Sequence, residues 1–541
     1  MKKAWRLALP FLLVLVLIGL SACKKEETNA DGSITLKVLH NWNGSSGAEN
    51  MLDNPVAEKI LEETGVRVEF EYTTGSETER ITQMFATGEE FDMYTGPAWG
   101  GESEVLLKAA NEGQLWDLTE YIEKYPNLAE LVKKENFAES LYDNIISKQK
   151  GGQFMLHANY PATDADVTNW LYGLYVNKEI ASEVGVDPQT VHSPEELYDF
   201  LKKIKDANLE VNGNPIYPLG ALGGGWPLDI MSEMFVPVAG STAWFIDDDG
   251  NTRLNFMTEE YENYILYMRK LLSEGLLDPE VYTHTDTIAK EKIAQGRVAA
   301  LPNQFPGLWT ELVKAGLQDK YVPLGPMNDF NGDKYRTEVN VTGNNLIAIP
   351  KTASKEKLEA AMKLMNFLAS DEGYLLANYG IEGVHYEMKD GKVEAKKEWV
   401  DKVQKDPKAL TNEGVMFGSL SGLNRQVSLA GGPFGYQYDE RYKVQAEFEK
   451  IMTPDGIKAT TGKDPNVVFN EHPKYEQIKA IFDTMGDVVL QAIHATSEGK
   501  AKELINGTRD ALEKAGIHEV EDEITKQAKS GTEFMRYRTS N

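Results

Sequence analysis

The spacing of hydrophobic and polar positions changes repeatedly along the chain after residue 33. Residues 34–40 are largely apolar, and apolar side chains alternate with polar ones over 66–72, as in β-strands. Between them, 54–65 carries a helical apolar stripe that opens with Asn-Pro and ends in glycine. A second helical stretch covers 80–87, and another apolar segment covers 91–94. This strand–helix–strand–helix–strand rhythm predicts a parallel α/β sheet.

The same signals predict further elements along the chain. Ser193 begins a capping box for a helix over 197–205, and Thr258 caps a long helix. The acidic run at 247–251 reads as a hairpin turn; a calcium-binding loop is the weaker alternative, because the expected glycine and glutamate positions are both threonine. A buried-type strand at 345–350 precedes a helix over 354–369. The remainder of the chain is mainly helical.

The first 23 residues form a secretory signal of the lipoprotein type. Three basic residues precede an apolar run over 7–20, which is shorter than the roughly 20 residues of a membrane-spanning helix. Small residues then lead directly into Cys23, the only cysteine of the chain. We expect cleavage before Cys23 and lipidation of its thiol; a buried free cysteine is the alternative. Two acyl chains would give stable anchoring on the outer face of the cell membrane.

Length and charge limit the classes of protein that remain. Removing residues 1–22 leaves 519 residues, which is too long for a single core. The formal net charge is −28, and because the removed segment holds three basic and no acidic residues, the remainder carries −31. Nucleic-acid binding requires a basic surface and is therefore not expected. Residues 24–33 are polar without periodicity and are predicted to be a flexible tether.

Tryptophans in predicted loops are the strongest candidates for contact with a solute. A flat apolar ring suits the CH face of a sugar, and planar amides and carboxylates suit its hydroxyl groups. Five tryptophans lie in or beside loops rich in Gly, Asn or Asp: Trp42, Trp99, Trp170, Trp226 and Trp309. For each of them, packing against a neighbouring loop is the alternative.

Polar residues near predicted strand ends form a second group of candidates. We name Asn41, Asp166 and Gln304 as ligand-binding candidates. Asp92, Asn169 and Asn344 occupy similar positions. Turn and capping hydrogen bonds are the structural alternative for every member of this group.

Catalytic motifs are missing from the sequence. None of the eight histidines belongs to an H-E-x-x-H pair, and the chain has neither a G-x-S-x-G elbow nor a Walker A loop. Paired carboxylates are too common among 84 acidic residues to indicate a glycosidase. We therefore predict no catalytic residue, no metal site and no cofactor.

Several stretches in order resemble the extracellular solute-binding proteins of ABC importers, specifically the long lipoprotein branch (family 1 type) that binds oligosaccharides. They are the lipobox with Cys23, 52–66, 174–178, 273–279 and 345–386. The resemblance implies an α/β, two-lobed periplasmic-binding-protein-like fold with a ligand cleft between the lobes.

The resemblance also implies how the chain is divided. We expect a signal peptide at 1–22, a lipidated tether at 23–33, an N-terminal lobe at 34–160 plus 340–382, and a C-terminal lobe at 165–337 plus 386–541. Crossings between the lobes are expected near 158–168, 337–343 and 380–386. Glu382 and His385 in the third crossing would line the cleft or fix the hinge, and Glu382 joins the ligand-binding candidates.

The predicted function is a membrane-anchored receptor that captures an oligosaccharide and delivers it to the permease subunits of an ABC transporter, acting as a monomer. Its partners would be the sugar, the permease and, through the lipid, the membrane. Two alternatives stay open: the same receptor role for a peptide or another small solute, and a surface glycoside hydrolase or lyase.

Overall fold

The computed structural model describes residues 28–42, 53–98, 101–133, 151–158, 172–247, 249–325, 345–406, 408–415, 420, 423, 440–452 and 463–534. Contacts between Cα atoms divide the chain into two compact units. Unit 1 takes its residues from Met1–Asn136, Gln149–Ala162 and Thr342–Gln437; unit 2 takes its residues from Phe137–Lys148, Thr163–Val341 and Tyr438–Asn541. No helix in the described part of the chain is long and apolar enough to cross a membrane.

Unit 1 is built on a five-stranded sheet with the order β2-β1-β3-β13-β4. Its strands are β1 (Ile34–His40), β2 (Val66–Tyr72), β3 (Met93–Pro97), β4 (Met155–Ala158) and β13 (Asn345–Ala348). The first three run parallel, and β13 is antiparallel to both of its neighbours. The carboxyl ends of β1 to β4 and the amino end of β13 therefore share one edge of the sheet, which we call the carboxyl edge of unit 1.

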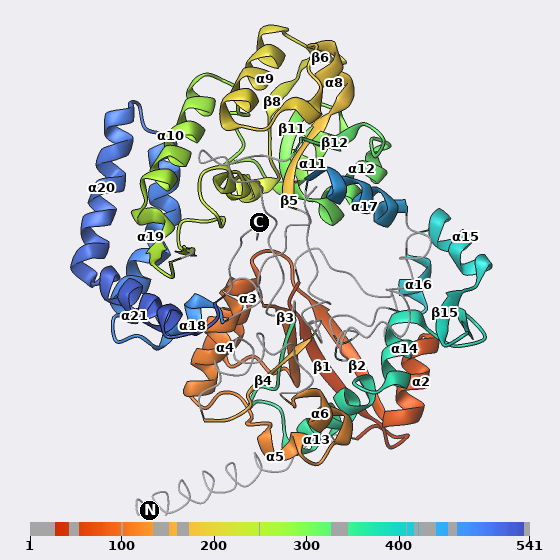
Figure 1. Ribbon diagram of the computed structural model, residues 1–541. Helices are drawn as coiled ribbons and strands as arrows, with labels where there is room; N and C mark the ends of the chain where they lie inside the picture. Colours follow the sequence, from red (N-terminus) through yellow and green to blue (C-terminus); the bar gives the residue numbers. More distant parts are fainter. Residues whose placement is uncertain are drawn as a thin grey trace, which may run out of the picture. The chain divides into compact units, whose positions relative to one another are not determined.

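Helices cover both faces of this sheet (Figure 1). One face packs on α3 and α4 through an apolar cluster that includes Leu39, Met84 and Leu106. The helices and remaining strands of unit 1 are α2 (Pro55–Thr64), α3 (Glu77–Thr87), α4 (Glu102–Asn111), α5 (Thr119–Ile122), α6 (Pro126–Leu131), α13 (Lys355–Leu368), α14 (Asp371–Tyr379), β14 (Tyr386–Lys389), β15 (Lys392–Ala395), α15 (Lys397–Lys405) and α16 (Ala409–Asn412).

Unit 2 is built on a four-stranded sheet with the order β12-β5-β11-β8. Its strands are β5 (Tyr172–Asn177), β8 (Tyr217–Leu219), β11 (Val298–Gln304) and β12 (Tyr321–Pro323). Strand β11 is parallel to β8 and antiparallel to β5, which is antiparallel to β12. The carboxyl ends of β8, β11 and β12 consequently share an edge with the amino end of β5, which we call the carboxyl edge of unit 2.

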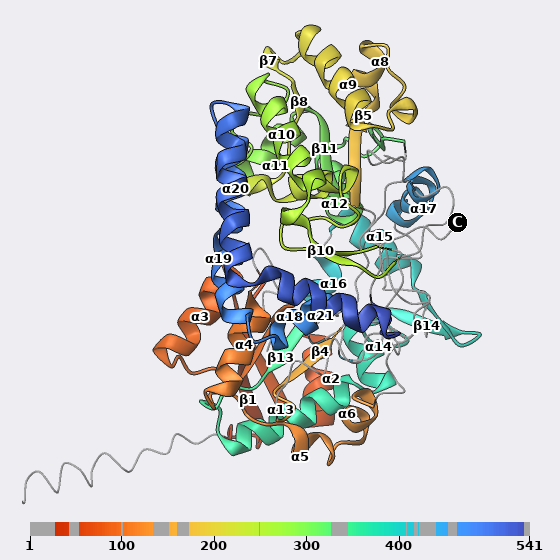
Figure 2. The ribbon, with the colours of Figure 1, turned by 60° about the vertical axis from the view of Figure 1, so that its left-hand side comes forward.

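The other elements of unit 2 are mostly helices, and α19, α20 and α21 lie together in Figure 2. Short strand pairs also occur: β6 (Glu210–Val211) with β7 (Asn214–Pro215), and β9 (Trp244–Ile246) with β10 (Thr252–Leu254). The helices are α8 (Lys178–Glu183), η3 (Pro188–Thr190), α9 (Pro194–Asp206), η4 (Gly223–Met234), η5 (Asn255–Met257), α10 (Glu259–Ser273), α11 (Asp286–Ala294), α12 (Phe305–Ala315), α17 (Glu440–Met452), α18 (Pro465–Glu471), α19 (Tyr475–Ile493), α20 (Glu498–Ala515) and α21 (Ile517–Lys529).

Local signals in the sequence placed many of these elements correctly. The Asn54 side chain accepts a hydrogen bond from the Ala57 amide at the start of α2, and Gly65 ends the helix in the left-handed conformation. Ser193 and Glu196 form the predicted capping box of α9. The predicted parallel arrangement is confirmed for β1, β2 and β3, whereas β13, which enters unit 1 after a long excursion through unit 2, is antiparallel to its neighbours. Such a connection does not impose the parallel orientation of a short helical crossover.

The expected C-terminal boundary differs from the division into units. Residues 386–437 were assigned to the second lobe, and 380–386 to a crossing, but both belong to the ranges of unit 1. Within the described residues, the Val56 amide of α2 donates to the Glu413 carbonyl at 3.2 Å. Gly414 is so close to Asn54 that a Cβ atom there would lie 1.9 Å from the Asn54 Oδ1. These contacts join the end of α16 to α2, although the two helices lie far apart in the sequence.

The predicted tether is also shorter than expected. Residues 28–33 are folded against the start of the sheet, where Asn29 donates to the Ser33 carbonyl at 2.7 Å and Thr28 pairs with Ile34. Asn, Asp, Gly and Ser are turn-forming residues, and their presence here explains why residues 28–33 adopt a folded conformation. The expectation of a tether therefore survives only for residues 23–27, where the prediction lies outside the described part of the chain.

A buried ion pair lies in unit 2, within a stretch on which the family resemblance was based. Lys292 of α11 donates to the Asp278 carboxylate at 2.6 Å and to Glu280 at 2.9 Å. The side chains of Lys292 and Asp278 are 6% and 1% exposed. Burial alone lowers the pKa of an ammonium group, but the hydrogen bonds that Lys292 donates to Asp278 and Glu280 outweigh this effect and raise the pKa of Lys292. The ion pair of Lys292 therefore stabilises the folded protein at neutral pH, and its contribution is lost only at strongly alkaline pH, where the ammonium group loses its proton.

Replacing Lys292 should test the strength of this pair. We expect Lys292→Met to lower the free energy of unfolding by about 3–5 kcal/mol, because Asp278 would remain buried without a counter-charge. Adding Asp278→Asn should recover part of the loss. Lys290→Met on the same helix is the matched control, since the Lys290 side chain is 39% exposed and its surface pair should contribute about 0–1 kcal/mol. Equal urea midpoints for the two single variants would contradict this account.

Candidate functional site

Three polar side chains form a row across the carboxyl edge of unit 1. His40 pairs in register with Tyr72 on one side and with Thr95 on the other, so the three side chains project from the same face of the sheet. The His40 and Tyr72 rings meet edge-on with their centroids 5.2 Å apart. In open α/β sheets, ligands bind beyond the carboxyl ends of the strands. This row therefore lies where a ligand of unit 1 is expected.

The row is rich in hydrogen-bonding atoms that lack partners. The His40 Nδ1, the Tyr72 hydroxyl and the Thr95 Oγ1 are buried and have no hydrogen-bond partner among the described residues. Burial lowers the pKa of the His40 imidazole to about 4 and raises the pKa of Tyr72 to about 12. Both rings are thus neutral at physiological pH, a state suited to hydroxyl groups of an uncharged ligand.

Glu102 adds a carboxylate near the same edge. It is the first residue of α4 and only 2% exposed, and one of its oxygens accepts a hydrogen bond from the Thr78 hydroxyl. The other oxygen has no partner among the described residues. Unpartnered buried atoms also occur elsewhere among the described residues, for example in Thr252 and Gln318. The group at this edge is singled out because it lies at the carboxyl ends of adjacent strands, where ligands are expected.

Asn41, by contrast, has a structural role. Its side chain is fully buried, donates to the Glu77 carbonyl at 2.9 Å and to the Tyr94 hydroxyl at 3.2 Å, and accepts from the Thr73 hydroxyl at 2.7 Å. A Cβ atom on Gly96 would lie 2.2 Å from the Tyr94 hydroxyl, so this network requires glycine there. These contacts fit the structural alternative for Asn41, and its ligand contact stays a prediction. Asp92 likewise accepts bonds from the Lys37 amide and the Lys357 ammonium.

The carboxyl edge of unit 2 carries a pair of amides at the end of β11. Asn303 is 1% exposed, and its Oδ1 accepts from the Gln304 amide at 2.8 Å, while its Nδ2 has no partner in the described part of the chain. Gln304 caps α12 without a side-chain capping bond, and its Oε1 also lacks a partner there. The predicted candidate Gln304 therefore lies at the carboxyl edge of unit 2, and Asn303 is a neighbour that sequence reasoning missed.

The glycine-rich stretch at 219–227 follows the carboxyl end of β8 and was expected to approach another segment closely. It does so: a Cβ atom on Gly223 would lie 2.4 Å from the Asp286 amide nitrogen, and one on Gly225 would lie 2.7 Å from the Tyr282 ring. The expectation that the whole stretch is a loop was wrong, since Gly223 begins η4. Gly224 and Gly225 have φ values of 66° and 71°, which only glycine adopts readily.

The structure places the five candidate tryptophans in different surroundings. Trp309 was expected in a loop but lies on α12, is 8% exposed and packs against Phe305 with ring centroids 5.7 Å apart, contacts that fit its structural alternative. Trp42 is half-buried directly after β1, at the carboxyl edge of unit 1. Trp226 lies within η4, but its side chain is outside the description. Trp99 and Trp170, together with Asp166, Asn169, Asn344 and the lipidation residue Cys23, fall outside the described residues.

Glu382 and His385 lie in unit 1 and not in a crossing segment. Glu382 is exposed, in a turn that pairs with Tyr386. His385 is fully buried, accepts from the Ile381 amide at 2.9 Å and packs against Trp399 in a tilted arrangement with ring centroids 4.5 Å apart. Burial lowers the pKa of His385. These contacts fix the local chain conformation around His385, and the two roles expected for Glu382 and His385, lining the cleft or fixing the hinge, stay predictions.

Acidic residues do not gather into a metal site in the described chain, where no group of three or more possible ligands was found. The acidic run at 247–251 forms the predicted hairpin turn between β9 and β10. In it, Asp247 accepts bonds from the backbone and side chain of Asn251 at 2.8 and 2.9 Å, and Lys529 donates to Asn251 at 2.7 Å.

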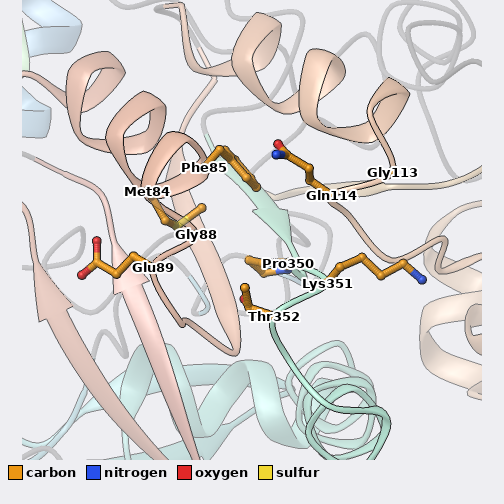
Figure 3. A pocket seen from close by; sticks show the side chains of 9 residues that line it. All are labelled: Met84, Phe85, Gly88, Glu89, Gly113, Gln114, Pro350, Lys351 and Thr352. Carbon is orange, nitrogen blue, oxygen red and sulfur yellow. The ribbon is translucent and has the colours of Figure 1, made fainter.

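A cavity of about 290 Å³ lies at the opposite, amino edge of the unit 1 sheet. Its walls come from the end of α3, the segment after α4 and the segment after β13; Phe85 and Gln114 point into it, whereas Lys351 points away (Figure 3). The Lys351 ammonium lies 3.4 Å from the centre of a Trp116 ring. This cavity is a strand length away from the polar row and is distinct from it.

Comparison with known proteins agrees with this arrangement. The profile of the family described as bacterial extracellular solute-binding proteins matches residues 48–374, which is more than half of the chain. The chain belongs to this family. Members of the family are receptors without catalytic activity, so the alternative of a hydrolase or lyase is set aside, and this solute-binding protein serves an ABC transporter.

Two relatives from Bacillus subtilis (strain 168) match most of the solute-binding protein. Lipoprotein LipO is 22% identical over 407 residues, covering 72% of this chain and 75% of LipO. The polygalacturonan/rhamnogalacturonan-binding protein YtcQ is 23% identical over 412 residues, covering 74% of this chain and 77% of YtcQ.

Solved structures show the same fold. FusA of S. pneumoniae in complex with kestose has a TM-score of 0.65 at 14% identity, covering 92% of this chain and 99% of FusA. An extracellular solute-binding protein of Bifidobacterium longum subsp. infantis has a TM-score of 0.64 at 19% identity, covering 94% of this chain and all of that one. The predicted solute-binding-protein fold is thereby confirmed.

The buried His40 should make the stability of unit 1 depend on acidity. Folding lowers the pKa of His40 from 6.5 to about 4. As the pH falls, His40 therefore binds a proton in the unfolded chain before it does so in the folded protein. Above pH 6.5 the neutral imidazole makes its full contribution to the free energy of unfolding. This contribution falls by up to about 3 kcal/mol as the pH falls towards 4.

We expect His40→Asn to flatten the decline of the unfolding free energy between pH 7 and pH 4.5. The same substitution at the exposed His494 is the control and should leave the slope of the parent protein unchanged. Identical pH slopes for His40→Asn and the parent, measured by urea titration, would contradict the assignment of a buried neutral imidazole.

Proposed function

We propose that this protein is a lipid-anchored receptor that captures an oligosaccharide outside the cell and delivers it to an ABC permease. The observation that carries the proposal is the concentration of neutral hydrogen-bonding groups without partners at the carboxyl edges. Histidine, tyrosine, threonine and amide side chains suit sugar hydroxyl groups, which both donate and accept hydrogen bonds. Trp42, which follows β1 directly, would supply an apolar platform for a sugar ring.

The names of relatives support a carbohydrate as the ligand. YtcQ is described as binding polygalacturonan and rhamnogalacturonan, and FusA was solved with kestose. The anchor is supported by the lipobox at Cys23 and by the name of LipO as a lipoprotein. A peptide or another small solute is the competing ligand class, and the experiment below includes it.

Thermal unfolding in the presence of candidate ligands tests the ligand class. A ligand that binds only the folded protein stabilises it by about 2.7 kcal/mol at a hundred times its dissociation constant. Using the chain from residue 24 without lipid, we expect one class among oligogalacturonides, rhamnogalacturonan fragments and fructo-oligosaccharides to raise the melting temperature, with the sugar recovered intact. A shift with peptides alone would overturn the carbohydrate assignment.

Gln304→Ala should weaken binding of the stabilising sugar without unfolding unit 2. The loss of one neutral hydrogen bond of about 0.5–1.5 kcal/mol corresponds to a 2- to 12-fold rise in Kd, measured by calorimetry. Gln295→Ala is a matched control, because this exposed glutamine precedes β11 at the other end of the same strand. Equal affinities for the two variants would show that the carboxyl edge of unit 2 does not contact the sugar.

A further inference from the structure

The segments at the carboxyl edge of unit 1 carry acidic residues, and no lysine or arginine occurs in the part of them that the structure describes. They are 41–42 and 53–54 after β1, 73–76 after β2, and 98 and 101 after β3, together with the first turns of α3 and α4. Their acidic residues are Asp53, Glu77, Glu79, Glu102 and Glu104. The rest of these connections, 43–52 and 99–100, adds no lysine or arginine in the sequence. The formal charge along this edge is thus negative.

Glu102 carries this charge into a buried position. The residue is only 2% exposed; one of its oxygens accepts from the Thr78 hydroxyl, and the other has no partner among the described residues. Burial raises the pKa of the Tyr94 hydroxyl on β3, and the negative charges of Glu102 and Glu77 raise it further, so both carboxylates act on groups of this strand. The unpartnered oxygen can accept a hydrogen bond from a sugar hydroxyl, but it repels a second carboxylate.

The first cations on the helices that begin at this edge are either paired or distant from it. Arg80 of α3 donates to Glu71 and Glu89 at 2.8 and 2.7 Å. Lys59 of α2 pairs with a glutamate of its own helix. Lys108 lies in the last turn of α4, at the far end of that helix. A carboxylate bound at the edge would therefore find no counter-charge on these three helices.

Helix N-termini attract anions, and α2, α3 and α4 all begin at this edge. Side chains of the protein itself already occupy these positions. Asn54 and Ser76 accept hydrogen bonds from backbone amides of α2 and α3. Glu77 and Glu102 each place a carboxylate in the first turn of α3 or α4, where it balances the positive end of the helix dipole. An anionic ligand would thus compete with carboxylates that are already in place.

We propose that the carboxyl edge of unit 1 accepts only uncharged sugar units, and that an oligosaccharide built entirely of uronic acids is therefore not a ligand of this protein. This inference rests on the proposed function and narrows it to a chemical class. His40, Tyr72 and Thr95 offer neutral hydrogen-bonding groups to such a sugar, and Glu102 accepts from its hydroxyl groups. A uronate would instead bring a second carboxylate towards Glu102, and like charges brought together at a binding site cost affinity.

Calorimetric titration with charged and uncharged trisaccharides tests this selectivity. The chain from residue 24 without lipid would be titrated with trigalacturonate and with the uncharged sugars kestose, xylotriose and galactotriose. We expect the lowest Kd for an uncharged sugar at about 0.05 M salt, where repulsion between charges is weakly screened. Raising the salt to about 0.5 M should lower the Kd of trigalacturonate, because salt screens that repulsion, and should leave the Kd of the uncharged sugar unchanged.

Glu102→Gln tests whether the buried carboxylate is responsible. The amide keeps the size of the side chain and an oxygen that can accept from Thr78, but it removes the negative charge. We expect the ratio of the Kd of trigalacturonate to the Kd of the uncharged sugar to fall by about 3- to 10-fold, because one like charge is removed from the binding site. Glu112→Gln makes the same charge change at the exposed far end of α4 and is the matched control, for which the ratio should not change.

The possible results separate the selectivity from the function. A lower Kd for trigalacturonate than for every uncharged sugar would overturn the proposed selectivity while leaving the receptor function intact. Equal ratios of the two Kd values in the Glu102→Gln and Glu112→Gln variants would do the same. If no sugar binds, the carbohydrate assignment itself is wrong, and the inference fails with it.

Discussion

The account depends on one physical constraint: a polar atom buried without a hydrogen-bond partner costs free energy, and a protein retains such atoms in a cluster only where something else satisfies them. In unit 1 the cluster is a row across three paired strands, His40 with Tyr72 and Thr95. In unit 2 it is the adjacent pair Asn303 and Gln304. Both clusters lie at strand ends; in unit 1 the sheet register brings the residues together, whereas in unit 2 they are neighbours on one strand.

The parts of the fold governed by short-range chemistry could be predicted from sequence. Helix starts at Asn54, Ser193 and Thr258 depend on side chains that accept hydrogen bonds from amides three residues further along the chain. The hairpin at Asp390 and Gly391 depends on two residues with positive φ, at 51° and 75°. Such signals are written into a few adjacent residues and need no knowledge of tertiary structure.

The parts that depend on distant partners could not be predicted in the same way. Trp309 has glycine and proline neighbours that suggest a loop, yet Pro306 and Gly307 lie in the first turn of α12 and the indole ring enters the core. The assignment of 386–415 to unit 1 follows from contacts between Glu413 and Val56, which lie more than 350 residues apart. Likewise, the row at the carboxyl edge appears only when the register of β1, β2 and β3 is known, although polar residues at successive strand ends were a usable signal.

Hydrogen–deuterium exchange with and without the stabilising oligosaccharide tests the central claim most directly, because it reports on both units at once. The account predicts slower exchange in the segments that follow β1, β2 and β11 at the carboxyl edges, including Trp42, Thr73 and Phe305. Exchange around the amino-edge cavity, at Glu89 and Thr352, should not change. Protection confined to that cavity, or absent from the ends of β1, β2 and β11, would show that the solute binds elsewhere.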